Sequence, residues 1–231
     1  MNKNCAFIFS LFIFDAHASP TDDYNAGLDA FKTGKFTQAA HLYIKAAEQN
    51  IVPAQYNLGN MYYKGLGVTR DSKQSAYWFT KAAEQGFDLA QFNLGDLYHN
   101  GYGVIEDHKQ EVHWLSKAAQ QGHVKAQFNL AQRYRNGHGV TQNSQKSAYW
   151  FSKAAEQGNT SAQFTLGYMY LKGIGVIQDK QQALTWFLVG SASGDKDSTN
   201  GRDIVEKMLT KQEQNNARGE AKKIFKRIKS D

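Results

Sequence analysis

The chain has 231 residues, of which 41% are hydrophobic and 21% charged, so its composition is that of a folded protein and excludes a disordered one. Its single cysteine, Cys5, excludes a disulfide framework and a zinc-thiolate site. The formal net charge is +6, and the segment from Arg218 to Asp231 contributes six basic against two acidic residues. The rest of the chain is close to neutral, which argues against nucleic acid as a partner.

Residues 1–18 have the pattern of a secretory signal peptide. Lys3 precedes an almost unbroken apolar run from Cys5 to Phe14, and Ala16-His17-Ala18 has the small-x-small form of a cleavage site. The run is too short for a membrane anchor, which needs about twenty apolar residues. We therefore expect cleavage between Ala18 and Ser19, release into the periplasm or beyond the cell, and a mature protein without cysteine.

Residues 22–53 predict a first pair of short helices. Gly27, Ala39 and Tyr43 are spaced as in a tetratricopeptide repeat with a short loop, and the segment resembles one. The sequence Lys-Ala-Ala-Glu-Gln at 45–49 recurs 36 residues later at 81–85. The segment is therefore expected to be the N-terminal repeat of a longer array.

Residues 54–196 repeat with a period of 36. In the first copy, Ala54, Leu58 and Tyr62 are spaced by four, which predicts a helix near 54–64 with one apolar stripe. A Gly-x-Gly-Val loop can end that helix, and Asp71 can cap a second helix that ends at Gly86. The copies are residues 54–89, 90–125, 126–161 and 162–196. Each has one tryptophan at the same register, which indicates core packing rather than a stacking platform: Trp78, Trp114, Trp150 and Trp186.

This pattern is similar to the Sel-1-like repeat, an α/α member of the tetratricopeptide superfamily. Residues 81–86 and 153–158 match the family's Lys-Ala-Ala-x-x-Gly ending closely. Ala131 departs from the glycine of the other copies, and residues 189–192 replace the Lys-Ala-Ala ending in the last one. The resemblance implies an all-α fold, a right-handed superhelix of antiparallel helix pairs. It would contain one tetratricopeptide-like repeat, four Sel-1-like repeats and a C-terminal capping helix pair.

Residues 197–231 predict that capping pair. Two amphipathic stripes would cover the last apolar face of the array; they contain Ile204, Val205, Met208 and Leu209, then Ala217, Ala221, Ile224, Phe225 and Ile228. The basic tail from Arg218 onward has two interpretations. It is either the solvated face of the cap or a weak contact for an anionic membrane surface.

Five histidines fall in the second and third copies: His99, His108, His113, His123 and His138. They form no i, i+4 pair, and the other copies have unrelated residues at these positions. Because a metal site normally needs three or four converging ligands, we expect neither a metal site nor a cofactor.

The sequence also predicts no catalytic residues. Some cysteine-rich relatives in this family are described as penicillin-binding or weakly β-lactamase-like, and residues 193–196 fit Ser-x-x-Lys while residues 32–34 fit Lys-Thr-Gly. The two motifs stand in reversed order at opposite ends of the array, and Ser-Asp-Asn is missing. A hydrolase of β-lactam or cell-wall type is therefore the alternative hypothesis, and a non-enzymatic protein the main one.

The superfamily binds partners on its concave face, and its positions map by resemblance onto three columns of the first helix of each copy. The columns are Asn60, Asp96, Gln132 and Tyr168; Tyr63, His99, Arg135 and Leu171; and Lys64, Asn100, Asn136 and Lys172. Their mixture of amide, aromatic and charged groups suits an extended polypeptide. The resemblance thus implies a monomeric scaffold or adaptor in the bacterial cell envelope that binds a protein or peptide. The convex face remains an open alternative.

Overall fold

The computed structural model describes residues 19–229, which form twelve α-helices and no strand. The helices are α1 (Pro20–Lys32), α2 (Phe36–Glu48), α3 (Val52–Lys64), α4 (Ser72–Glu84), α5 (Asp88–Asn100), α6 (His108–Gln120), α7 (Val124–Asn136), α8 (Ser144–Glu156), α9 (Thr160–Lys172), α10 (Lys180–Ala192), α11 (Lys196–Glu206) and α12 (Lys211–Ile228). The predicted signal peptide, residues 1–18, lies outside the described residues. Among helices α1–α12, none is both long and apolar enough to cross a membrane.

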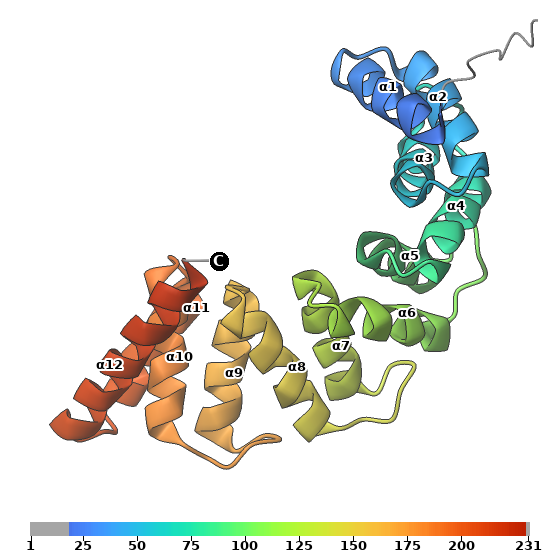
Figure 1. Ribbon diagram of the computed structural model, residues 1–231. Helices are drawn as coiled ribbons and strands as arrows, with labels where there is room; N and C mark the ends of the chain where they lie inside the picture. The colour runs from blue at the N-terminus through green and yellow to red at the C-terminus, as the bar shows by residue number, and fades with distance from the viewer. Residues whose placement is uncertain (1–18, 230–231) are drawn as a thin grey trace, which may run out of the picture.

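Successive helices pack against each other, so that α1–α10 form five stacked pairs. The stack curves into an open arc, with α3 and α5 on its inner side and α4 and α6 on its outer side (Figure 1). The predicted all-α solenoid is confirmed. We call the first helix of each pair helix A (α1, α3, α5, α7 and α9) and the second helix B (α2, α4, α6, α8 and α10). The exposed side of the A helices is the helix-A face.

The ends of the helices follow the repeated cap residues. Four A helices end at a glycine in the left-handed conformation: Gly65, Gly101, Gly137 and Gly173. Four B helices begin at an Asp or Asn whose side chain accepts a backbone N–H: Asp71, Asp107, Asn143 and Asp179. Both predicted types of cap are present.

The second glycine of each loop permits a close approach to the preceding repeat. Gly139 has a φ of +71°, and a Cβ atom there would lie 2.0 Å from the carbonyl oxygen of His108. Only glycine leaves room for this backbone contact in this conformation. The loop after α7 therefore lies directly on the start of α6.

The core consists of the periodic apolar side chains. The exposed fractions of Trp78, Trp114 and Trp186 are 9%, 8% and 5%, and Trp150 is half-buried against the same clusters. The predicted role of the tryptophans in packing is confirmed. Because the alanine, leucine and tryptophan positions recur in every copy, they serve the common fold and carry little information about function.

A ladder of buried glutamines links successive pairs. Gln127 Nε2 donates to the Ala119 carbonyl oxygen at 3.1 Å, and its Oε1 accepts from Gln157 Nε2 at 2.8 Å. Gln55 and Gln91 make both bonds in the same way. Gln163 donates to the Ala155 carbonyl oxygen but accepts no bond, because the residue in the place of the donor glutamine is Ser193. Its Oε1 is buried without a partner, so the last rung of the ladder is incomplete.

The array ends in the two predicted capping helices, α11 and α12. Both pack against α10, and Arg218 of α12 forms an ion pair with Glu206 of α11 at 2.9 Å. Ala221 and Ile224 join the core cluster of α8 and α9. The predicted stripe of α11 is only partly used, because Ile204 stays 54% exposed.

Candidate functional site

All twelve predicted site residues lie on the surface of the A helices, and none is buried. Asn60, Tyr63, His99, Gln132 and Leu171 are half-buried, and the other seven are exposed. The third column, Lys64, Asn100, Asn136 and Lys172, consists of the last residue of each helix A, immediately before the glycine cap. The columns are therefore accessible, but they do not form one continuous site.

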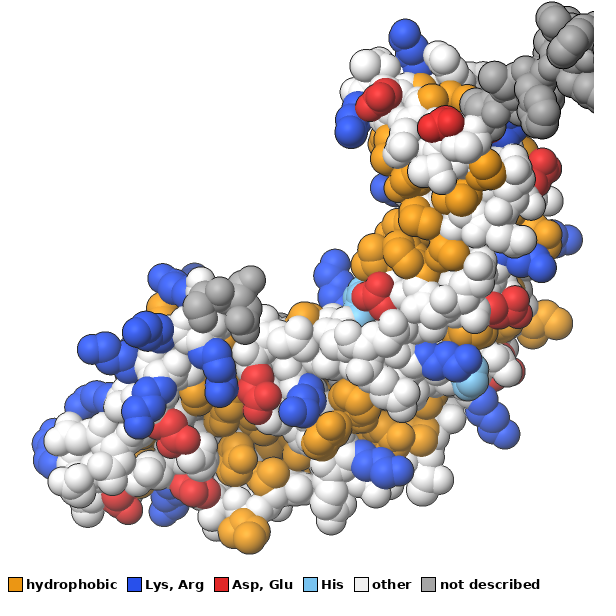
Figure 2. All heavy atoms as spheres, in the orientation of Figure 1, with side chains coloured by type: hydrophobic (Ala, Val, Ile, Leu, Met, Phe, Trp, Pro, Cys, Tyr) orange, Lys and Arg blue, Asp and Glu red, His pale blue; other side chains and the backbone are white. Residues whose placement is uncertain are grey.

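The first two A helices, α1 and α3, border a hollow at the N-terminal end of the helix-A face. We call it the N-terminal hollow; it has a volume of about 420 Å³ between α1 and α3, and its lining includes Leu28, Phe31, Tyr56, Asn60 and Lys64. A smaller hollow of about 120 Å³ continues between α3 and α5, beside Tyr63 and Asp96. Hydrophobic side chains gather on this inner side of the arc (Figure 2).

A second hollow, the C-terminal hollow, lies between α9 and α11. Its volume is about 670 Å³, and its lining includes Phe164, Tyr168, Leu171, Lys172 and Ile204. Three predicted residues of the fourth copy are thus brought together. The exposed Ile204 of α11 contributes to the same apolar lining. The sequence predicts only a capping role for this residue.

The third copy contributes to neither hollow. The guanidinium of Arg135 lies 5.8 Å from the ring centre of Phe151, and its Nε contacts the Asn136 side chain. In the second copy the amide of Asn100 donates back to the Asp96 carbonyl oxygen at 2.8 Å. The predicted residues therefore divide into two separated groups, with side chains of local structural role between them.

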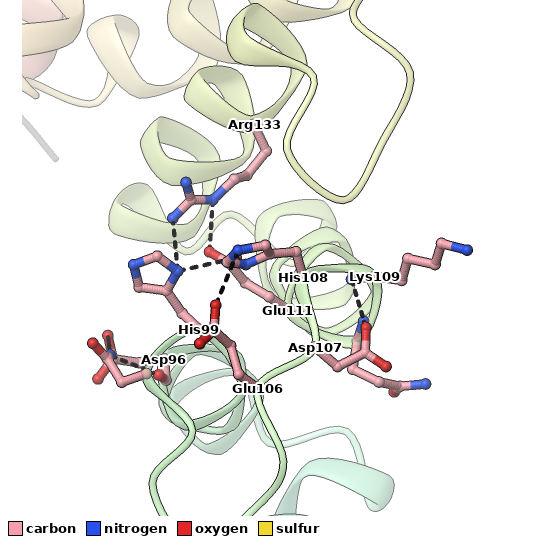
Figure 3. Close-up of polar contacts among 10 residues, drawn as sticks. Asp96, His99, Glu106, Asp107, His108, Lys109, Glu111 and Arg133 are labelled. Atoms are coloured by element: carbon pink, nitrogen blue, oxygen red, sulfur yellow. Dashed lines mark hydrogen bonds and ion pairs between the residues drawn. The ribbon is translucent and has the colours of Figure 1, made fainter.

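A charged cluster that the sequence did not predict lies between α5, α6 and α7 (Figure 3). Its centre is Glu111, whose side chain is only 3% exposed, and Arg133 Nε donates to Glu111 Oε1 at 2.7 Å. Arg133 is itself 15% exposed. A carboxylate and a guanidinium are thus largely removed from water and face each other, an arrangement that requires mutual pairing.

This ion pair replaces uncharged residues found at the same positions elsewhere in the array. The positions 36 residues before and after Glu111 are Ser75 and Ser147, and those around Arg133 are Leu97 and Met169. All four are buried. The fold therefore does not need the ion pair, and the one copy in which glutamate stands in place of serine is the signal by which sequence comparison could have found it.

Two histidines contact Glu111, and a third stacks on one of them. Nδ1 of His108 lies 3.1 Å from Glu111 Oε2, and Nδ1 of His99 lies 3.3 Å from the same oxygen. Glu106 Oε1 is 3.3 Å from His108 Nε2, and the ring of His138 stacks on His108 with centres 6.1 Å apart. Stacking of the repeats thus unites histidines that the sequence separates by nine residues or more.

The remaining histidine of interest, His123, has a structural role. Its Nδ1 accepts the N–H of Ala126 at 3.1 Å and so caps α7, and its ring stacks on Phe92 with centres 4.6 Å apart. Burial lowers the pKa of His123 below its ordinary value, because the charged imidazolium is costly away from water. The equivalent Asn159 caps α9 in the same way.

Comparison with known proteins identifies the family. The profile of the Sel1 repeat matches residues 24–51, 52–87, 88–123, 124–159 and 160–195, which together cover most of the chain. The chain belongs to the Sel1 repeat family. The first matched segment is the one expected to be tetratricopeptide-like, so the Sel1 array has five repeats.

One solved Sel1 structure supports this fold, and two further solved structures are less similar. A Sel1 repeat protein from Oxalobacter formigenes is 34% identical, with a TM-score of 0.72 over 76% of this chain and 72% of that one. A protective antigen of uropathogenic Escherichia coli is 25% identical over 90% of this chain and 69% of its own, with a TM-score of 0.44. A Sel1 repeat protein from Klebsiella pneumoniae is 22% identical over 81% and 93%, with a TM-score of 0.48. No match was found among curated proteins.

The hydrolase motifs do not converge in this Sel1 array. Ser193 caps the end of α10 and Lys196 begins α11, whereas residues 32–34 lie at the end of α1, at the other end of the arc (Figure 1). A nucleophile and its activating groups must lie within hydrogen-bond reach of each other. The β-lactam alternative therefore has no structural support.

Proposed function

We propose that this protein is a non-enzymatic scaffold of the bacterial cell envelope that binds a polypeptide partner along its helix-A face. Sel1 repeat proteins are generally scaffolds for protein–protein interaction, and this chain has their fold. The face, the location and the chemistry of the partner are the proposed part.

One observation carries the proposal, namely that the helix-A face has two hollows of the same character. Each has an apolar floor, from Leu28 and Phe31 in the first and from Phe164 and Leu171 in the second. Exposed apolar surface of this kind typically marks an interaction site. Two separated hollows on one face suit an extended chain that places one apolar side chain in each.

The rims of the hollows indicate the charge of the partner. Lys32 and Lys64 line the N-terminal hollow, and Lys172 and Lys180 line the C-terminal one, where Asp197 is the acidic exception. Complementary charges at the edge of an interface favour association and select partners. We therefore infer a polypeptide with acidic residues beside its apolar anchors.

The envelope location rests on the N-terminal sequence. Residues 1–18 have the signal-peptide pattern and include the only cysteine. The first helix follows directly on the proposed cleavage site, because Ser19 caps α1 with a full capping box. A mature chain beginning at Ser19 would thus keep every described helix intact.

Affinity capture from envelope extract, read by mass spectrometry, tests the face. The double variant Tyr168→Ala/Lys172→Glu removes an aromatic ring and a positive charge from the lining of the C-terminal hollow. We expect recovery of the partner to fall at least about tenfold, as for loss of an interface anchor. The matched control is Tyr149→Ala/Lys153→Glu on α8, where an exposed tyrosine and a half-buried lysine have the same spacing. Equal recovery with both variants would contradict the proposed face.

The role of the basic tail stays a prediction. Lys222, Lys223 and Lys226 lie exposed on α12, and basic residues cover this end of the molecule (Figure 2). If the tail contacts anionic lipid, liposomes containing phosphatidylglycerol will sediment the full chain but not a variant with these three lysines changed to glutamine. Equal sedimentation would leave the tail as a solvated cap.

A further inference from the structure

We propose that His99, His108 and Glu111 form a binding site for a divalent transition metal ion of the zinc class. One donor atom from each of the three lies within 4.8 Å of the others. The contacts to Glu111 Oε2 are 3.3 Å from His99 Nδ1 and 3.1 Å from His108 Nδ1. Two imidazole nitrogens and one carboxylate oxygen are a donor set that zinc takes in open sites, with a fourth position left for water or another ligand.

The groups behind these three side chains are placed as outer partners of a metal site. Glu106 Oε1 lies 3.3 Å from His108 Nε2, so the carboxylate can accept the proton of that nitrogen and leave Nδ1 free to bind. Arg133 Nε holds Glu111 Oε1 at 2.7 Å, which leaves Oε2 directed at the histidines (Figure 3). Such contacts fix the tautomer and the orientation of metal ligands.

Two of the three proposed ligands are partly open to solvent, so an ion can reach the site. The Glu111 side chain is 3% exposed, whereas those of His99 and His108 are 40% and 38% exposed. The group that opposes an ion is Arg133, whose Nη2 lies 3.3 Å from His99 Nδ1. That contact is at the long end of the hydrogen-bond range, so a metal can take its place while the shorter bond to Glu111 remains.

The other repeats show that the fold does not require this combination. At the positions equivalent to His99, His108 and Glu111, the preceding copy has Tyr63, Ser72 and Ser75, and the following copy has Arg135, Ser144 and Ser147. None of these six residues is a histidine or a carboxylate. Three metal-binding side chains therefore meet at one junction between repeats. At the equivalent positions of the neighbouring junctions, the same fold is built with residues that do not bind metal.

Isothermal titration of tag-free protein with Zn²⁺ tests the proposal. We expect one ion per chain, and affinity weakened about tenfold or more by His99→Ala and by His108→Ala. The control is His113→Ala, because His113 is exposed on the same helix but packs on Trp114 outside the cluster. Glu106→Gln keeps all three ligands and is expected to weaken binding about tenfold through the orientation of His108.

Two results would overturn the proposal. The first is the absence of zinc binding to the parent chain, and the second is equal affinity in the parent, His99→Ala and His108→Ala proteins. Circular dichroism of each metal-free variant separates a lost ligand from a lost fold, and the partial exposure of both histidines makes the folded outcome the expected one. If His108→Ala is unfolded, His99→Ala alone decides, since it removes a ligand from a different helix.

Discussion

Replacing Arg133 by methionine should leave Glu111 as a buried charge without its cation. The two side chains are 15% and 3% exposed, and their short contact of 2.7 Å is the principal compensation for burial of the carboxylate. Removing one partner of such a pair costs about 3–5 kcal/mol. Because His108 Nδ1 also lies 3.1 Å from Glu111, we expect a loss near the lower limit, about 3 kcal/mol.

The double variant Glu111→Ser/Arg133→Met should recover most of this loss. It reproduces the residues of the next junction, Ser147 and Met169, which the same fold already buries. Replacement of a buried ion pair by well-packed apolar groups is often neutral or stabilising by about 1–4 kcal/mol. Methionine is such a group, whereas the buried serine hydroxyl has no hydrogen-bond partner at the equivalent Ser147 and offsets part of this gain. Because Glu111→Ser alone also leaves a largely buried charge unpaired, the cycle of single and double variants should give a coupling free energy of at least about 3 kcal/mol between the two positions.

Urea unfolding in the presence of a chelator measures these free energies without a contribution from metal. Tryptophan fluorescence and circular dichroism should give coincident transitions, which is the condition for a two-state free energy. The reasoning is refuted if Arg133→Met is as stable as the parent chain, or if the double variant is as unstable as the single one. In either case the ion pair would not be equivalent to the uncharged pair of Ser147 and Met169 at the next junction.

Three further predictions concern a helix cap, the glutamine ladder and a loop of the array. Burial lowers the pKa of His123, so the neutral ring is the form that caps α7. The cap's full contribution to stability is present at pH values above the ordinary pKa of histidine and is lost as the ring is protonated. The parent should therefore lose stability relative to His123→Asn as pH falls from about 7 to about 5. Ser193→Gln supplies the missing donor to Gln163 Oε1 and should stabilise by about 1 kcal/mol. Gly139→Ala places Cβ against the start of α6 and should cost about 2 kcal/mol more than Gly122→Ala, where the space is open.

Thermal or urea unfolding of each variant checks these expectations. A stability difference between parent and His123→Asn that does not change with pH would show that the ring of His123 is not a neutral cap in solution. Ser193→Gln fails if it leaves the midpoint unchanged. Equal losses for the two glycine variants, which share a positive φ, would mean that backbone conformation alone decides and that the contact with α6 has no energetic weight.

The fold was predictable because its determinants recur at fixed spacing. Ala54, Leu58 and Trp78 have equivalents in every later copy, so a single physical interpretation of one copy gave the helices and caps of four. The sequence does not reveal the role of the recurring Gln55, since its partners are Ala47 in α2 and Gln85 just after α4.

The candidate site was harder to predict because function lies in departures from the pattern. His99, His108 and Arg133 meet only through the stacking of α5, α6 and α7, and no spacing along the chain brings them into one helical face. Glu111 belongs to no motif of the repeat. Comparison with Ser75 and Ser147 marks it as a departure from the other copies, and its burial then shows why the departure matters.

The central claim is that a polypeptide partner lies along the helix-A face. Site-specific photo-crosslinking tests it most directly, with a photoreactive amino acid placed either at Tyr168 beside the C-terminal hollow or at Tyr149 on α8. The two positions are matched in accessibility, with exposed fractions of 43% and 54%. We predict a crosslinked partner from position 168 and none from position 149 in envelope extract. Crosslinking from position 149 alone would contradict the claim and place the partner on the helix-B side.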